Sequence, residues 1–235
     1  MVSAMFPLKL HQVLVHRRGK TVIGPVDLEL GPQGATMIVG PNGSGKTTLL
    51  RVMHGIERIS SGSVQWEDDD PAKHAFVFQS PVVLRRTVVQ NLAYPLELLK
   101  LPKLTVKTSV AEWLGRIGLQ GKADMSATRL SGGERQKLAI ARALIRKPDV
   151  LFLDEPCANL DGHATREIEA ILQEATAAGT RLVMATHDMG QARRLAHDLV
   201  FMLNGKIHET GGADSIFECP KTKELTAFLN GDIVV

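Results

Sequence analysis

The sequence has few cysteines and no long apolar run, and each shortage excludes a class of protein. Its two cysteines, Cys157 and Cys219, are too few for a disulfide framework and fit no metal-ligand spacing. The longest apolar runs, such as residues 199–203, have about five residues, whereas a helix that crosses a bilayer needs roughly 20. Residues 1–10 contain a proline and a lysine and lack the pattern of a secretory signal. We therefore expect a cytoplasmic protein that does not itself cross the membrane.

Neither sign of charge dominates. The 235 residues include 28 lysines and arginines against 25 aspartates and glutamates, which gives a formal charge of +3. Adjacent arginines occur as short pairs and form no basic stripe, so we expect no nucleic-acid partner. A chain of this length buries roughly 70% of the surface that its unfolded form exposes. It can therefore fold as one domain without disulfides or a structural metal.

Turn residues divide the chain into short β-rich and helical segments. Continuous apolar strands that alternate with helices indicate parallel strands covered on both faces. We predict an α/β fold in one domain, residues 1–235: a mostly parallel core sheet from about 1–80 and 148–235, an antiparallel region near the start, and an inserted helical subdomain at about 81–147. The predicted strands are 8–15, 21–30, 36–39, 63–66, 75–78, 150–153, 182–186, 199–203 and 206–209. The predicted helices are 47–54, 88–99, 108–117, 132–147, 164–178 and 189–196.

The first motif that carries chemistry is a glycine loop between a predicted strand and a predicted helix. Its residues fit the phosphate-binding loop pattern and run on into the helix: Gly40, Pro41, Asn42, Gly43, Ser44, Gly45, Lys46, Thr47 and Thr48. Glycines let the backbone wrap around phosphates, and the N-terminus of the helix adds positive potential. We expect Lys46 to reach the β- and γ-phosphates of a nucleotide and Thr47 to coordinate Mg²⁺. A plain glycine-rich turn is the alternative.

The second motif is an apolar strand that ends in two carboxylates, Asp154 and Glu155. Parallel sheets bind ligands at the carboxyl ends of their strands, so these side chains are well placed to serve a nucleotide. We assign Asp154 to Mg²⁺, through a water molecule, and Glu155 to acceptance of a proton from an attacking water. An acidic pair after a strand is more often only the start of a loop. The phosphate-binding loop upstream favours the catalytic interpretation.

The third motif comprises Leu130, Ser131, Gly132, Gly133 and Glu134. Ser131 and Glu134 have the spacing of a capping box at the start of a helix. Capping does not explain the two glycines, each of which costs a helix about 1 kcal/mol relative to alanine. Close approach of the backbone to a phosphate is the natural reason for them.

Together these motifs resemble the nucleotide-binding subunit of ATP-binding cassette (ABC) transporters, over nearly the whole chain. The resemblance implies the ABC ATPase fold, ATP and Mg²⁺ as ligands, and hydrolysis coupled to transmembrane transport. It also implies a head-to-tail dimer with a second copy of the chain. In that dimer each ATP lies between the phosphate-binding loop of one copy and residues 130–134 of the other, which gives the two glycines a role.

The resemblance assigns further residues one by one. Gln79 matches a glutamine that senses Mg²⁺ and the attacking water, and His187 matches a histidine that contacts the γ-phosphate. A loop that crosses the dimer interface is matched by Asn159, Leu160 and Asp161. The family usually stacks adenine on an aromatic residue shortly before the first long strand, and there this chain has His16, Arg17 and Arg18. An imidazole or a guanidinium can stack on a base, but the choice of nucleotide is less well defined.

The resemblance is strongest to importers, in particular those of tungstate- and molybdate-type oxyanions. It rests on the run after Gln79, from Pro81 to Leu96, where we expect integral membrane permease subunits to contact the chain. A substrate-binding protein would then be an indirect partner, and the chain would be peripheral on the inner face of the cell membrane. Two alternatives stay open: a soluble ABC ATPase of an assembly process such as iron–sulfur cluster assembly, and an exporter or lipoprotein-release ATPase.

Overall fold

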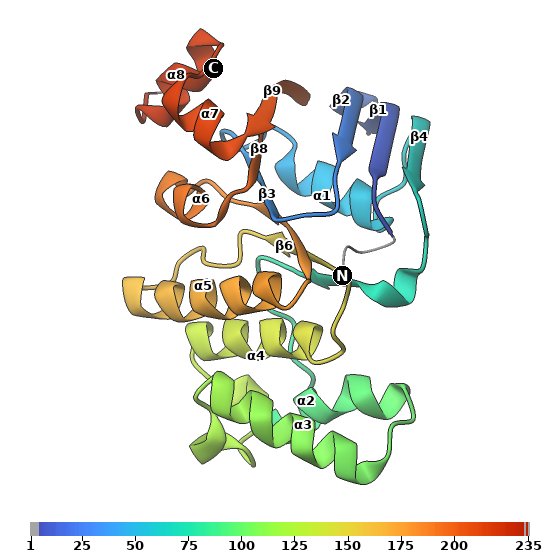
Figure 1. Ribbon diagram of the computed structural model, residues 1–235, viewed down its shortest axis with the longest axis vertical. Coiled ribbons are helices and arrows are strands. Elements are labelled where there is room, and N and C mark those ends of the chain that lie inside the picture. The colour runs from blue at the N-terminus through green and yellow to red at the C-terminus, as the bar shows by residue number, and fades with distance from the viewer. Residues whose placement is uncertain (1–4, 233, 235) are drawn as a thin grey trace.

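The computed structural model describes residues 5–232 and 234 (Figure 1). The first four residues of the segment 1–10, on which the expectation about a secretory signal depends, lie outside this part of the chain. Among the residues described, no helix combines the length and the apolar character needed to cross a membrane.

Two sheets form the framework. A three-stranded antiparallel sheet has the order β2-β1-β4, and a six-stranded sheet has the order β5-β6-β7-β3-β8-β9. In the larger sheet β9 is antiparallel to β8 and the other neighbours are parallel. The strands are β1 (Leu8–Arg17), β2 (Lys20–Leu30), β3 (Ala35–Val39), β4 (Ser61–Trp66), β5 (His74–Val77), β6 (Val150–Asp154), β7 (Arg181–Ala185), β8 (Asp198–Leu203) and β9 (Lys206–Gly212). The predicted α/β class and the antiparallel region near the start are confirmed.

The helices occupy the predicted places, with two additions at the end of the chain. They are α1 (Lys46–His54), α2 (Val88–Leu98), α3 (Lys103–Arg116), α4 (Gly132–Leu144), α5 (Gly162–Ala177), α6 (Met189–Leu195), α7 (Ala213–Glu218) and α8 (Lys223–Leu229). The described part of the chain also contains the 3₁₀ helices η1 (Pro71–Lys73), η2 (Gln120–Lys122) and η3 (Ala127–Arg129). The predicted end of α4 at residue 147 is too late, because Lys147 has a φ of 54° and precedes a proline. Helices α7 and α8 were not predicted, since each is short and depends on burying one or two apolar side chains.

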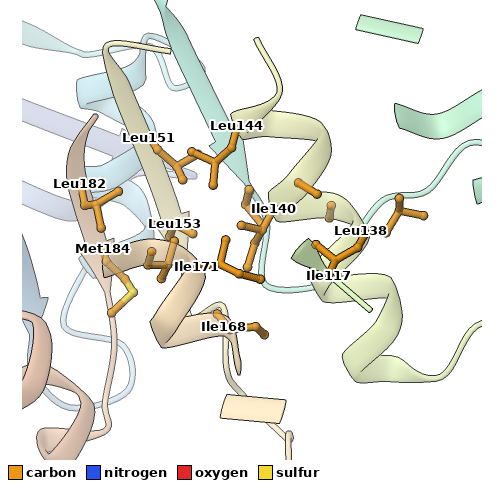
Figure 2. Packing of buried hydrophobic residues seen from close by; sticks show 14 of the residues in the cluster. Ile117, Leu138, Ile140, Leu144, Leu151, Leu153, Ile168, Ile171, Leu182 and Met184 are labelled. Atoms are coloured by element: carbon orange, nitrogen blue, oxygen red, sulfur yellow. The ribbon is translucent and has the colours of Figure 1, made fainter. Parts of the chain in front are cut away.

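Alternate residues of the central strands face two separate hydrophobic cores. On one face of the larger sheet, Leu151 and Leu153 of β6 pack with apolar residues of α4 and α5 (Figure 2). On the other face, Phe152 packs with α1 and the antiparallel sheet. Because strands covered on both faces have no polar side, β3, β6 and β7 are buried at every position.

The topology brings together the ends of three strands that are distant in sequence. Strands β6, β7 and β3 are neighbours in the larger sheet and run parallel. Their carboxyl ends therefore share one edge, at which the chain continues into Gly40, Glu155 and Thr186. A sheet of this kind binds its ligands at that edge.

Candidate nucleotide-binding site

The loop between β3 and α1 has the backbone geometry that its glycines predict. Gly40 and Gly45 have φ angles of 148° and 102°. A Cβ atom at Gly45 would lie 2.5 Å from the Cγ2 atom of Ile23, so a larger residue does not fit there. Helix α1 begins without a side-chain cap, and its first N–H groups are therefore open to an anion.

Lys46 lies in this loop with its ammonium group turned toward the backbone. The residue is 5% exposed, and its Nζ atom donates to the carbonyl oxygens of Gly40 at 2.8 Å and Pro41 at 3.1 Å. Burial lowers the pKa of Lys46, while Glu155 and Asp154 act in the opposite direction. The Nζ atom is 4.0 Å from the Glu155 Oε1 atom, so this cation links the loop to the end of β6.

Asp154 is buried and meets two residues of α1. The Thr47 hydroxyl donates to its Oδ1 atom at 2.8 Å, and the Arg51 guanidinium is 3.9 Å from Oδ2. Burial is the main cause that raises the pKa of Asp154, and the Thr47 hydrogen bond and Arg51 lower it. A hydroxyl and a carboxylate in contact are oxygen donors of the kind that Mg²⁺ prefers, so these residues fit that ion. Sequence reasoning missed Arg51, although it lies one helical turn after Thr47 on the same face.

Glu155 is the point at which three strand ends converge. Its Oε2 atom accepts a hydrogen bond from Gln79 Nε2 at 3.3 Å and lies 3.1 Å from His187 Nδ1. Its φ is 46°, an unusual value for a residue with a side chain, and its N–H donates to the carbonyl of Ala185 at 2.9 Å. The structure thus brings Glu155 together with Gln79, 76 residues before it, and with His187, 32 residues after it.

Lys46, Thr47 and Glu155 line one cavity of about 520 Å³, and Asp154 lies outside its lining, behind Thr47. Its lining includes these residues that the sequence predicted for the site: several of the phosphate-binding loop, and Gln79, Glu155, Asn159 and His187. Two lining residues were not predicted, Val22 and Ala158. Neither has a polar side chain, and only the tertiary structure identifies them.

Residues 130–134 do not line this cavity. Their predicted capping box is present, since Ser131 and Glu134 exchange hydrogen bonds at the start of α4. A Cβ atom at Gly133 would lie 3.2 Å from the Cβ of Ala164 on α5, so close packing within one chain explains why this position is a glycine. A Cβ at Gly132 would meet nothing within 4 Å, so the fold of one chain does not explain that glycine.

The predicted residues of the interface loop and of the adenine site are also outside the lining of the cavity, apart from Asn159. Asp161 caps α5 by accepting from the N–H of Ala164, and Leu160 packs against the core. The other three are in and beside the turn between β1 and β2: His16, Arg17 and Arg18. The His16 ring meets the Thr21 hydroxyl, and Arg17 forms an ion pair with Glu57. No side chain in the lining of the cavity is aromatic apart from the imidazole of His187.

A glycine loop at a helix N-terminus, a buried lysine, and carboxylates at the end of a neighbouring parallel strand define a P-loop nucleotide hydrolase. Within that class, residues 23–158 match the model of the ABC transporter family. The chain belongs to this family, and it is an ATP-binding ABC ATPase.

Relatives and a solved structure agree with this assignment. The chain is 37% identical to the tungstate uptake system ATP-binding protein TupC of Peptoclostridium acidaminophilum, over 83% of this chain and 93% of the relative. It is 34% identical to a phosphate import ATP-binding protein of Natronomonas pharaonis, over 92% and 84%. Its fold is similar to that of a dimeric ATP-binding cassette in a post-hydrolysis state, bound to ADP and Pi, with a TM-score of 0.78 and 26% identity over 88% of this chain and 98% of the other.

Proposed function

We propose that this chain hydrolyses ATP at the cavity described above and that Glu155 is the general base. The observation that carries the proposal is the contact of Glu155 with both Gln79 and His187, beside Lys46. A carboxylate at this place accepts a proton from a water molecule that attacks the γ-phosphate. Gln79 and His187 hold the carboxylate and the reacting groups in position. Lys46 and the backbone N–H groups of residues 40–48 stabilise the negative charge on the phosphates.

Thr47 and Asp154 are the residues that would hold Mg²⁺. The bound ion would supply positive charge that neutralises the phosphate oxygens. Thr47 and Asp154 already contact each other across α1 and β6, so the oxygen donors are preorganised.

The test of the general base is Glu155→Gln. The amide keeps the size of the side chain but cannot accept the proton, so we expect the turnover of ATP to fall by at least about 100-fold. Binding of ATP, measured by equilibrium titration, should persist, and ATP-loaded dimers should accumulate in size-exclusion chromatography. Hydrolysis at the wild-type rate would refute the role of Glu155.

The active unit in this proposal is a head-to-tail dimer. Residues 130–134 lie outside the cavity of their own chain, and a second copy could bring Gly132 to the phosphates without a side chain in the way. Asn159, Leu160 and Asp161 would then lie at the interface between the copies. The similar solved structure is a dimer bound to ADP and Pi, which supports this arrangement.

We further propose that hydrolysis powers a membrane importer, with permease subunits docked next to residues 81–96. An open apolar groove of about 640 Å³ between α2 and α3 supports this. Val89 and Ala93 line it from within that run, and Val106, Val110 and Ala111 line it from α3. Residues 81–147 would turn as a subdomain against a core of 1–80 and 148–235, and the chain would be peripheral on the inner face of the cell membrane.

The cargo in this proposal is a small oxyanion such as tungstate. One relative is named for tungstate uptake and another for phosphate import, which supports an oxyanion, whereas a third, of Vibrio cholerae, is named for the import of Fe(3+) ions. The test is the stimulation of ATP hydrolysis in the reconstituted transporter by a binding protein loaded with tungstate, molybdate, phosphate or sulfate. Stimulation by tungstate above the others would support the proposal, and none by any oxyanion would refute it.

A further inference from the structure

A chain of hydrogen-bonded polar side chains begins at Thr186, directly before His187, and its members Thr186, Gln191 and Glu169 are buried. Gln191, at the start of α6, is 1% exposed. Its Oε1 atom accepts from the Thr186 hydroxyl at 3.1 Å, and its Nε2 atom donates to Glu169 Oε1, on α5, at 3.4 Å. Arg194 in turn donates to both oxygens of Glu169, at 2.8 and 2.7 Å. Both the oxygen and the nitrogen of the Gln191 amide are therefore hydrogen-bonded to buried residues, Thr186 and Glu169.

This chain of hydrogen bonds fixes the residues on either side of His187. The N–H of Asp188 donates to the Thr186 hydroxyl at 3.1 Å, and the N–H of Gln191 donates to Asp188 Oδ1 at 2.9 Å. The His187 side chain is 57% exposed and meets Glu155 at its tip. Because so little packing holds the ring itself, the position of the ring depends on the turn beneath it.

The Gln191 amide also lies near the loop that follows β6 and contains Glu155 and Asn159. Burial raises the pKa of the Cys157 thiol, and the nearby side chains of Gln191 and Thr165 act in the opposite direction. Cys157 lies two residues after Glu155 and two before Asn159, which lines the cavity. Gln191 thus lies between the turn of His187, to which it is hydrogen-bonded through Thr186, and the loop that follows Glu155.

We propose that Gln191 is a positioning residue for hydrolysis, which holds the turn of His187 in register with the loop of Glu155. The proposal rests on the roles proposed above for His187 and Glu155. A hydrogen bond in a buried, weakly polar surrounding is stronger than one in water, and a partner left without one is penalised. Loss of the amide therefore shifts the turn rather than leaving it in place.

The first variant is Gln191→Leu, which keeps most of the volume and removes both hydrogen bonds. Small displacements of a catalytic group lower rates strongly, so we expect kcat to fall by about tenfold or more. KM for ATP should change by less than about twofold, because Gln191 does not touch the phosphate-binding loop. The matched control is Leu225→Ala in α8, which removes a buried side chain far along the chain from the site. It should lower the melting temperature and leave kcat per nucleotide-binding site unchanged.

The second variant, Gln191→Glu, separates positioning from mere packing through its pH profile. A protonated carboxyl can accept from Thr186 and donate to Glu169 as the amide does. Burial and the carboxylates of Glu169 and Asp188 raise the pKa of the new group, and Arg194, which pairs with Glu169, acts in the opposite direction; an ionised carboxyl also loses the donor to Glu169. The ratio of its kcat to that of the wild type should therefore fall about fivefold or more between about pH 6 and about pH 8.5. A ratio that does not change with pH would contradict the proposal.

A double variant tests whether Gln191 acts through His187. If it does, His187→Ala with Gln191→Leu should be no slower than His187→Ala alone. The proposal would be overturned if the two substitutions lowered kcat independently, so that the double variant were slower than His187→Ala by the factor that Gln191→Leu shows alone. It would also be overturned if Gln191→Leu kept kcat within about twofold of the wild type. A wild-type protein without ATP hydrolysis, or a His187→Ala variant with full activity, would instead refute the proposed function.

Discussion

At the scale of single residues, the environment of a side chain decides its chemistry. Cys157 shows this: burial, together with nearby Glu169 and Asp188, raises the pKa of its thiol from 9.0 to about 11. The thiolate is the reactive form, and it is therefore about 100-fold scarcer near pH 8 than for an unshifted thiol. We expect iodoacetamide to modify Cys157 at least that much more slowly than the exposed Cys219, as measured by mass spectrometry of the folded protein.

Denaturation before labelling is the control, since it should make the two thiols react at similar rates. Equal rates in the folded protein would show that the Cys157 thiol is not held in its neutral form. The result bears on function, because an inert Cys157 cannot act as a redox switch beside Glu155.

At the scale of elements, helices α2 and α3 form a surface that neither forms alone. The groove between them is open and mostly apolar, with Glu97, Lys103 and Lys107 also in its lining, and Ala111 lies exposed there. A charge placed there must be desolvated when an apolar partner docks, which is unfavourable. We expect Ala111→Glu to abolish recovery of the chain with the reconstituted permease, while ATP hydrolysis by the free chain stays within about twofold of the wild type.

Thr105→Glu is the matched control, because Thr105 is exposed on the same helix outside the lining of the groove. It should leave permease binding intact. If both variants bind the permease as the wild type does, the docking surface lies elsewhere.

The loop before α2 is held by Asn91, a buried residue of α2. Asn91 accepts from the N–H of Leu84 at 2.9 Å and from Arg142 at 3.1 Å, and it donates to the carbonyl of Thr87 at 2.9 Å. The loop after Gln79 is thereby tied to α2 and α4. A movement of these helices would be transmitted to the loop that carries Gln79.

At the scale of the whole molecule, Arg181 joins three segments that lie far apart in the sequence. Its guanidinium donates to the carbonyl of Gly31 at 3.0 Å and to the Thr36 hydroxyl at 2.6 Å, and it is 3.3 Å from Asp198. Burial lowers its pKa to about 10, against the effect of Asp198, so Arg181 remains charged at neutral pH. We expect Arg181→Ala to reduce the free energy of unfolding by about 3–5 kcal/mol, measured in urea, because buried partners lose their donor.

Arg166→Ala provides the comparison, since Arg166 is exposed on α5 and its replacement should change stability by less than about 0.5 kcal/mol. A loss of the same size in both variants would mean that removal of an arginine, rather than the buried contacts of Arg181, lowers stability.

The sequence predicted those parts of the fold that depend on local pattern. Apolar runs bounded by glycine or proline identified the strands, and the capping box of Ser131 and Glu134 identified the start of α4. Helix bounds were less accurate where backbone conformation at a single residue, such as Lys147, ends the element. Helices α7 and α8 escaped prediction because a short helix is stabilised mainly by tertiary packing.

By itself the sequence determined the chemistry available to this protein. The spacing of Gly40, Lys46 and Thr47 specifies a phosphate-binding loop, and a strand that ends in Asp154 and Glu155 specifies carboxylates at a sheet edge. These are properties of short segments. Only the tertiary structure decided which groups meet: Glu155 with Gln79 and His187, Asp154 with Arg51, and Gln191 with Glu169. Such contacts depend on strand order and on helix packing, which bring together residues whose separation in the chain carries no local signal.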